Sequence, residues 1–164
     1  MKEGLDLLMV ALSSLGNNGA LWFGLALLLL VKKAWRPAGG SLLLGILLAA
    51  LAQDVLKDFF ARPRPVVADP STLLVEMPTT FSFPSGHTML AFCAAGILYS
   101  VFPRLAAPVL VLACLIGFSR LYLGVHYTSD VIGGALIGLA ISVFVVWIKG
   151  RVTRWREKTE KMKM

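Results

Sequence analysis

Residues 81–87 read Phe-Ser-Phe-Pro-Ser-Gly-His, and this stretch stands between two apolar parts of the chain. Pro84 suits the entrance of a helix, Ser85 is a residue type that caps helices, and Gly86 lets a ligand approach the backbone. The apolar run at residues 88–102 predicts the helix that follows. Free N–H groups in the first turn of a helix, with the positive end of its dipole, favour an anion. The stretch therefore predicts a phosphate-binding helix start with a histidine beside it.

The composition is typical of a membrane protein. The chain has 164 residues, enough for a single domain over residues 1–164. Its hydrophobic fraction is 57% and its mean hydropathy +0.78, whereas soluble domains have about 45–50% apolar residues. A very apolar soluble bundle is the alternative. Residues 25–31 and 132–148 argue against it, because they carry no charge and show little polar face.

The apolar segments predict an all-α, polytopic bundle of about five transmembrane helices plus a short N-terminal interfacial helix. The five spans are expected at residues 20–31, 41–56, 88–102, 105–118 and 130–148. Residues 5–15 are shorter than the roughly 20 residues that a span needs. We interpret them as an interfacial or re-entrant helix, with a short true span as the alternative, followed by a turn that ends at residue 19. Residues 149–164 form a basic tail that we expect to fray into solvent.

Basic residues predict the orientation of these spans. Five spans place three basic segments on one side: residues 32–36, Arg104 and the tail. They hold eleven of the 16 lysines and arginines, so this side is cytoplasmic by the positive-inside rule. The net charge of +7 therefore reflects topology and contact with anionic lipid headgroups, and we expect no nucleic-acid partner. Cys93 and Cys114 lie in apolar segments, which favours inert packing over a disulfide or a metal site.

Charged residues and imidazoles gather at the opposite, outward ends of the predicted spans. Four separate segments supply six of them, namely Lys57, Arg64, His87, Arg120, His126 and Asp130. A charge at mid-bilayer costs on the order of 2.5–3.5 kcal/mol, so such residues usually have partners or a function. Their convergence on one membrane face predicts a single site.

Chemistry follows from these residue types. Three fixed cations suit a phosphate or pyrophosphate, and they also stabilise the charge that develops in phosphoryl transfer. His126 and Asp130 are four residues apart, so the carboxylate can bond one imidazole nitrogen and leave the other free to attack. His87 is then available to protonate the leaving oxygen. Nucleophile, orienting group, acid and anion cradle are thus present without a metal or cofactor.

Three motifs carry a resemblance to a known family. Lys57-x6-Arg64-Pro65, Pro84-Ser85-Gly86-His87 and Ser119-Arg120-x5-His126-x3-Asp130 follow one another in that order. Together they resemble the signature of the type 2 phosphatidic acid phosphatase superfamily, in its integral-membrane lipid phosphatase branch. The resemblance covers roughly residues 57–130.

The resemblance implies a helical bundle and a role for each matching residue. His126 becomes a phosphohistidine, Asp130 supports it, and His87 is the general acid. The phosphate-binding residues are Lys57, Arg64, Ser85, Gly86 and Arg120. Members of this branch commonly have six spans, so the short segment at residues 5–15 is a departure from the pattern.

Bland explanations exist for each residue taken alone. His87 can cap or pack, His126 can be an interfacial aromatic, and Asp130 can be an N-cap. Lys57 and Arg64 can snorkel to the membrane edge. For Asp54, Asp58 and Arg62 local ion pairing is the only role that we predict.

The resulting hypothesis is a metal-independent lipid phosphatase in the cytoplasmic membrane of a bacterium. Its site faces the periplasm or cell exterior and its C-terminus is cytoplasmic. Undecaprenyl pyrophosphate is the favoured substrate, on family analogy and topology. Phosphatidylglycerophosphate, phosphatidate and a lipid phosphotransferase reaction are alternatives within the same chemistry. A transporter that binds an anion through the cationic cluster is the non-enzymatic alternative.

Overall fold

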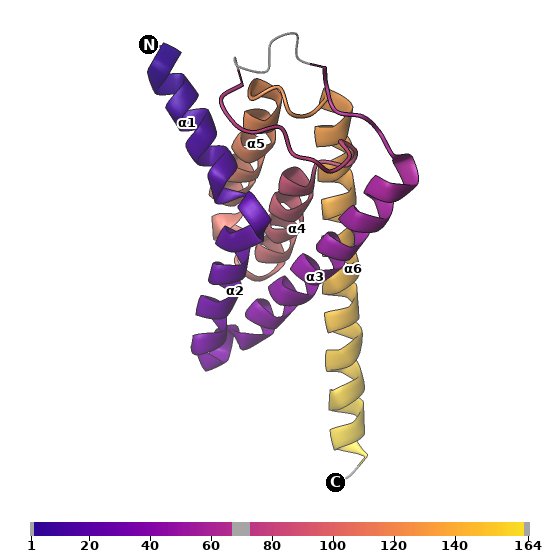
Figure 1. Cartoon of the computed structure of the whole chain (residues 1–164). Helices are drawn as coiled ribbons and strands as arrows, with labels where there is room; N and C mark the ends of the chain where they lie inside the picture. Colours follow the sequence, from indigo (N-terminus) through magenta and orange to yellow (C-terminus); the bar gives the residue numbers. More distant parts are fainter. Residues whose placement is uncertain (1, 67–72, 163–164) are drawn as a thin grey trace.

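A computed structural model describes residues 2–66 and 73–162 as a helical bundle (Figure 1). Its α-helices are α1 (Lys2–Leu15), α2 (Ala20–Val31), α3 (Arg36–Phe60), α4 (Gly86–Val101), α5 (Ala106–Tyr122) and α6 (Thr128–Lys161). Short 3-10 turns η1 (Asn17–Gly19), η2 (Lys33–Trp35) and η4 (Pro103–Leu105) connect them. The all-helical prediction is confirmed, and α2 to α6 lie where the five spans were expected.

Helix α4 lies at the centre of the bundle, packed against α3, α5 and α6. Two glycines of α6 make this packing close. A Cβ atom on Gly134 would lie 2.6 Å from the Ser85 carbonyl oxygen, and one on Gly138 would lie 2.3 Å from the Met89 carbonyl oxygen. The backbones of α4 and α6 therefore touch, because the four-residue spacing of these glycines places both on one face of α6.

Three helical segments are long and apolar enough to cross a membrane by themselves: Lys33–Phe60, Pro103–Tyr122 and Thr128–Lys161. Helices α1 and α2 together form a fourth, bent by 52° at the break between them. Helix α4 has 16 residues and thus a length of only about 24 Å, short of the roughly 30 Å hydrocarbon core. The neighbouring helices surround it, so it need not meet both membrane surfaces by its own length.

Helix α1 is more than a surface helix. Its Met9 and Leu12 pack with Leu123 and Val125, which belong to the connection between α5 and α6. The N-terminal segment therefore contacts the loop that carries His126. Gly19, with φ of 68°, supplies the left-handed residue at the entrance of α2.

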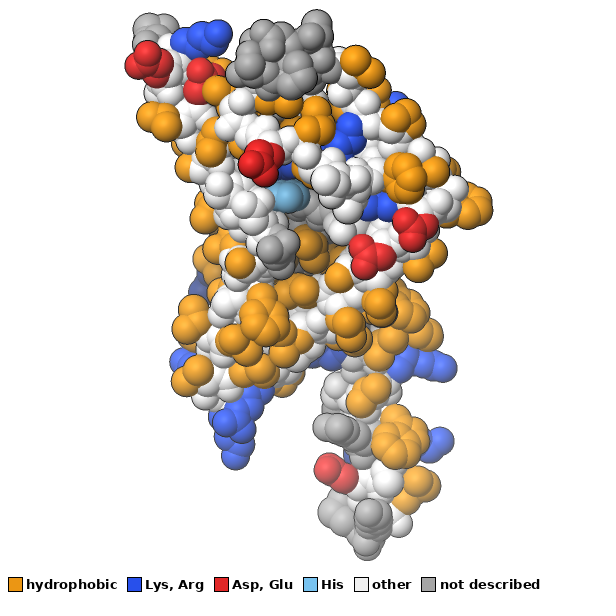
Figure 2. Space-filling view, in the orientation of Figure 1, with side chains coloured by type: hydrophobic (Ala, Val, Ile, Leu, Met, Phe, Trp, Pro, Cys, Tyr) orange, Lys and Arg blue, Asp and Glu red, His pale blue; other side chains and the backbone are white. Residues whose placement is uncertain are grey.

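The expectation that the C-terminal tail frays is wrong for the described residues. Helix α6 continues through Lys161 and projects beyond the bundle (Figure 1). From Lys149 onward the chain has no proline and Gly150 is its only glycine, so nothing breaks the helix. Figure 2 shows the result: lysines and arginines gather on this projection and at the lower end of the bundle, below apolar flanks, and a histidine lies in a hollow toward the other end.

Candidate active site

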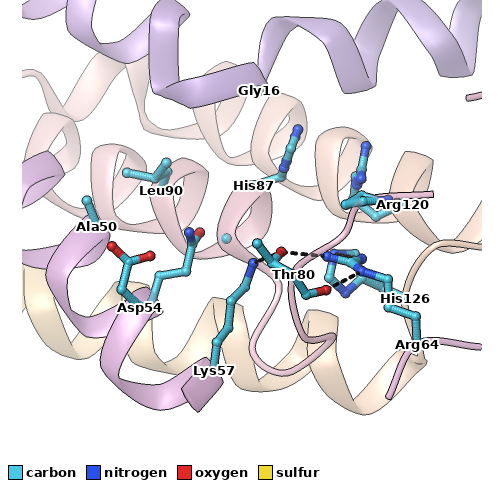
Figure 3. Close-up of a pocket in the computed structure, with 13 residues that line it drawn as sticks. Gly16, Ala50, Asp54, Lys57, Arg64, Thr80, His87, Leu90, Arg120 and His126 are labelled. Carbon is cyan, nitrogen blue, oxygen red and sulfur yellow. Dashed lines mark hydrogen bonds between the residues drawn. The ribbon is translucent and has the colours of Figure 1, made fainter. Parts of the chain in front are cut away.

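A pocket of about 420 Å³ lies where the connection between α3 and α4 crosses the end of the bundle (Figure 3). Six predicted site residues line it, namely Lys57, Arg64, Gly86, His87, Arg120 and His126. The other two, Ser85 and Asp130, are fully buried in the protein. The structure thus brings together residues from α3, α4, α5 and two connecting segments, as the clustering at one end predicted.

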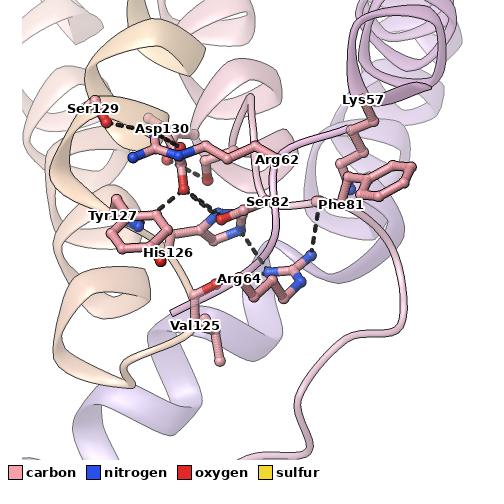
Figure 4. Close-up of polar contacts among 12 residues, drawn as sticks. Lys57, Arg62, Arg64, Phe81, Ser82, Val125, His126, Tyr127, Ser129 and Asp130 are labelled. Atoms are coloured by element: carbon pink, nitrogen blue, oxygen red, sulfur yellow. Dashed lines mark hydrogen bonds and ion pairs between the residues drawn. The ribbon is translucent and has the colours of Figure 1, made fainter. Parts of the chain in front are cut away.

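His126 and Asp130 form the expected pair, with a third group between them (Figure 4). The His126 Nδ1 atom lies 3.4 Å from Asp130 Oδ2. The Ser82 hydroxyl donates to the same carboxylate oxygen and lies 3.4 Å from Nδ1. Asp130 is not the N-cap of α6 but its third residue, where it accepts a 2.9 Å bond from the Tyr127 backbone N–H. Ser82 belongs to the stretch quoted at the outset, yet its role there was not predicted.

The two Arg-Pro dipeptides have different partners. Arg64 Nη1 lies 3.3 Å from His126 Nε2 and donates a 2.8 Å bond to the Val125 carbonyl. Arg62 Nη1 instead forms a 2.7 Å ion pair with Asp130 Oδ1, while its guanidinium stacks 4.2 Å above the Tyr127 ring. Arg62 was expected to form only a local ion pair, and this prediction is wrong. The prediction from the spacing to Lys57 that Arg64, and not Arg62, lies beside the pocket agrees with the structure.

Thr80 holds two of the cations in place. Lys57 Nζ donates a 2.8 Å bond to its hydroxyl, and Arg64 Nε donates a 2.7 Å bond to its carbonyl. Thr80 lies in the long connection between α3 and α4 and belongs to none of the three motifs, so this role was not predicted. The threonine thus holds the two positively charged side chains near each other despite their mutual repulsion.

His87 and Arg120 are held from the N-terminal side. His87 Nε2 lies 2.9 Å from Asn17 Oδ1, and Arg120 Nη1 donates to the Ser13 hydroxyl. Arg120 is buried, and its Nε has no hydrogen-bond partner within the described part of the chain. A buried donor of this kind is costly unless a ligand satisfies it, which favours an anion beside Arg120.

The start of α4 differs from its expected capping. Ser85 occupies the N-cap position, but its hydroxyl pairs with the Thr88 hydroxyl at 2.9 Å, and its backbone N–H donates to the Asp130 carbonyl. A Cβ atom at position 86 would lie 1.4 Å from the Gln53 side-chain oxygen, so any larger residue there would displace the Gln53 side chain. As at the start of any helix, the backbone N–H groups in the first turn of α4 have no hydrogen-bond partner within the helix, and here they lie at the wall of the pocket.

Electrostatics keep the His126 imidazole neutral. Burial, then the positive charges of Arg64 and Arg120, lower the pKa of His126 to about 3, against the opposing effect of Asp130. Burial likewise lowers the pKa of Arg64. Since the Arg64 N–H faces Nε2, that nitrogen is the acceptor and Nδ1 carries the proton toward Ser82 and Asp130. The nitrogen with the free electron pair therefore faces the cationic pocket.

Other polar groups belong to this site only in part. Asp54 lines the pocket, and Asp58 is exposed. Both cysteines are free thiols: Cys93 is buried, whereas Cys114 is exposed on α5. Cys114 was expected to be buried in packing, but its face of α5 is turned away from the other helices. Within residues 2–66 and 73–162 no three His, Cys, Asp or Glu side chains cluster as metal ligands would.

Comparisons with known proteins agree with this geometry. An undecaprenyl-diphosphatase from Sulfolobus acidocaldarius is 35% identical over 144 residues, which cover 87% of this chain and 69% of that protein. Phosphatidylglycerophosphatase B from Bacillus subtilis is 37% identical over 121 residues, which cover 66% of this chain and 56% of that protein. The fold and the site define the class as that of integral-membrane phosphatases. A profile of the PAP2 superfamily matches residues 38–154, and the chain belongs to this superfamily.

Solved structures show the same architecture. The transmembrane PAP2-type phosphatidylglycerolphosphate phosphatase of Bacillus subtilis superposes with a TM-score of 0.75 at 32% identity, covering 90% of this chain and 78% of that one. LpxE of Aquifex aeolicus gives a TM-score of 0.75 at 34% identity, covering 87% and 85% of the two chains. The family that the three motifs predicted is therefore confirmed.

Proposed function

We propose that the protein hydrolyses a phosphate monoester or pyrophosphate on a membrane lipid through a phosphohistidine at His126. One observation carries the proposal. The neutral His126 ring directs Nε2 toward a pocket that also contains His87, Lys57 and Arg120. Asp130 and Ser82 contact the other ring nitrogen, Nδ1. A nucleophile, its orienting carboxylate, an acid and an anion cradle thus share one site.

In the first step, His126 Nε2 attacks phosphorus in line with the departing oxygen. The N–P bond forms as the P–O bond to the lipid breaks, and His87, which enters this step as the imidazolium, gives one of its two N–H protons to the leaving oxygen and becomes neutral. The imidazole gains positive charge, which Asp130 stabilises across Nδ1–H. Arg64 turns from Nε2 to a phosphoryl oxygen, because the electron pair that it faced now binds phosphorus.

In the second step, His87 is the base. It takes a proton from a water molecule, whose oxygen bonds to phosphorus as the N–P bond breaks. Phosphate leaves, and His126 returns to its neutral form. Residues of this chain and one water molecule supply every group that the two steps require, so we expect full turnover after thorough chelation of divalent metals.

Phosphate oxygens bind to Lys57, Arg64, Arg120 and the first-turn N–H of Gly86. These groups converge on the pocket from α3, α4, α5 and the connecting segment. The remaining buried donor, Arg120 Nε, gains a partner when an anion binds. Ser85 joins the phosphate ligands only if its hydroxyl turns away from Thr88.

Undecaprenyl pyrophosphate is the favoured substrate, since one relative is an undecaprenyl-diphosphatase. Phosphatidylglycerophosphate, the substrate class of another relative, and phosphatidate are alternatives, and a lipid phosphotransferase would use the same residues. The pocket also has an apolar wall at Ala50 and Leu90, against which a lipid tail can lie. The site faces the outside of the cell and the basic C-terminus lies in the cytoplasm.

Phosphate release in detergent micelles tests the proposal. The purified chain is assayed against undecaprenyl pyrophosphate, phosphatidylglycerophosphate and phosphatidate, with orthovanadate as a mimic of pentavalent phosphorus. We expect His126→Ala to lower turnover by at least about 10³-fold, whereas Thr159→Ala, on the exposed α6 projection, keeps it. Wild-type turnover in His126→Ala would contradict the nucleophile, and complete insensitivity to vanadate would contradict the phosphohistidine. Anion binding without turnover of any of the three lipids would favour the transporter.

A further inference from the structure

The bend between α1 and α2 forms one wall of the pocket. Gly16 lines the cavity, and His87 is directed toward it (Figure 3). A Cβ atom on Gly16 would lie 2.6 Å from His87 Cδ2, so only glycine lets the imidazole come this close. The adjacent residues Ser13 and Asn17 contact Arg120 and His87 through their side chains. None of these three residues belongs to the three motifs that predicted the site.

The contact between Asn17 and His87 has a definite chemical sense. The amide oxygen of asparagine only accepts hydrogen bonds, so the His87 Nε2 that lies 2.9 Å from it carries a proton. Asn17 is also the one hydrogen-bond partner of this ring among residues 2–66 and 73–162. The amide therefore fixes the direction of the ring and keeps a proton on Nε2, so the other ring nitrogen carries the proton that the acid step transfers.

The two histidines of the site differ in what holds them. His126 lies against the carboxylate of Asp130, which supports the positive charge that a nucleophilic imidazole acquires. His87 lies against a neutral amide, which orients an N–H group without adding a charge that would bind the proton strongly. As the acid, His87 passes from the imidazolium to the neutral imidazole, and a neutral partner at Nε2 leaves the imidazolium more acidic than a carboxylate would.

We propose that Asn17 is a positioning residue for the acid step, acting on the lipid leaving group through His87. The inference rests on the proposed function, because it takes from it the role of His87. It extends the site to the bend between α1 and α2, and it makes this bend a determinant of how well poor leaving groups are expelled.

Leaving-group dependence separates this role from a structural one. Phenyl phosphate and p-nitrophenyl phosphate have similar size, but phenol, with a pKa of about 10, is much the poorer leaving group and needs a proton from the acid. We expect Asn17→Leu to lower kcat/KM for phenyl phosphate about tenfold, the size of one lost hydrogen bond, and to change that for p-nitrophenyl phosphate less than about twofold. Asn17→Gln keeps a neutral amide acceptor and is expected to keep most of the activity on both esters.

Matched variants make the outcome decisive. Ser14→Ala is the control, since Ser14 is exposed on α1 and bonds only the Val10 carbonyl of its own helix. Asn17 is exposed too, so its replacement needs no repacking of the core. Equal losses on both esters in Asn17→Leu, or failure of Asn17→Gln to retain activity, would overturn the positioning role.

His87→Ala distinguishes the inference from the function on which it rests. It should show the same leaving-group selectivity as Asn17→Leu, but more strongly. Selectivity in His87→Ala without any in Asn17→Leu would overturn the inference alone. Absence of selectivity in His87→Ala would instead remove the acid role of His87, and with it the mechanism proposed above.

Discussion

His126 is the nucleophile in the proposed reaction, and its surroundings determine its protonation state. It is 6% exposed, and burial together with Arg64 and Arg120 lowers its pKa to about 3. The neutral ring is therefore favoured in the folded protein at every pH well above that value, whereas an ordinary histidine gains its proton near pH 6.5. We expect substrate-free His126 to remain neutral, and able to attack, from about pH 7.5 down to about pH 5.

NMR of histidine-labelled protein in micelles measures this directly. The chain has 2 histidines, so His87→Asn leaves His126 as the only imidazole signal. Its ring shifts should stay constant over that pH range, and Arg64→Gln, which removes a nearby positive charge, should move the titration upward. A midpoint near 6.5 in the parent variant would show that the burial and the cations do not act on the ring as described.

Residue types and spacing were sufficient to predict which side chains gather at the pocket but not the groups that hold them. Motifs identify His87, His126 and Asp130 because the chemistry requires those side chains in that order. Ser82 and Thr80 contribute only hydroxyl or carbonyl contacts, which many residues can supply. Such contacts depend on how a loop folds over the bundle, and no periodic pattern in the sequence records that path.

Arg62 illustrates the same limit. Local spacing correctly assigns Arg64 to the pocket, yet the partner of Arg62 lies 68 residues away in the sequence. Its ion pair with Asp130 forms because the segment after α3 crosses the start of α6 (Figure 4). The sequence shows that both charges exist, whereas their pairing is a property of the tertiary fold.

Among the helices, the contact between α4 and α6 determines whether the site assembles. Helix α4 carries His87, and α6 carries Asp130, which contacts the His126 ring, so the separation of the two helices affects the distance between the proposed acid and the proposed nucleophile. We expect Gly138→Ala to force the helices apart, since its Cβ would lie 2.3 Å from the backbone oxygen of Met89, which cannot move aside like a side chain. Overpacking of this kind costs about 1–3 kcal/mol, and a loss of turnover should accompany the lower Tm.

Gly24→Ala in α2 provides the matched control for thermal unfolding in detergent. No atom lies within 4 Å of a Cβ built at Gly24, and alanine favours a helix more than glycine does. Its Tm should be unchanged or higher, with full turnover. Equal stability of Gly138→Ala and Gly24→Ala would show that the close approach of α4 and α6 is not needed.

Helix positions were predictable because apolar runs and their breaks are local features. Helix ends were less so. The basic charges after Lys149 suggested a fraying tail, but helix formation needs only suitable residues and the absence of breakers, so α6 continues to Lys161. Similarly, the short apolar run at the N-terminus predicted a helix there but not the side chains that this segment contacts. Ser13 meets Arg120, and Asn17 meets His87, only because the chain bends after the first helix.

At the scale of the whole molecule, two groups of positive charge have different causes. Lys57, Arg64 and Arg120 surround the pocket, where they are partly or fully buried and held by specific hydrogen bonds. The other group lies at the opposite end of the bundle, in η2, η4 and the α6 projection, and its exposed members are Lys33, Arg104, Arg151, Arg154, Lys158 and Lys161. The first group fits an anionic substrate, and the second fits the cytoplasmic surface of a membrane.

This separation predicts the sidedness of the protein. In a variant without native cysteines, made by Cys93→Ala and Cys114→Ala, single cysteines are placed at Val66 beside the site and at Lys158 on the α6 projection. Val66 is 95% exposed and Lys158 is also exposed, so burial will not block either thiol. An impermeant maleimide should label Val66→Cys in intact cells and Lys158→Cys only after lysis. The reverse pattern would place the pocket in the cytoplasm, where its substrate would have to be a lipid phosphate of the inner leaflet. Labelling of both in intact cells would mean that the α6 projection does not remain in the cytoplasm, and the positive-inside argument would then fail for this chain.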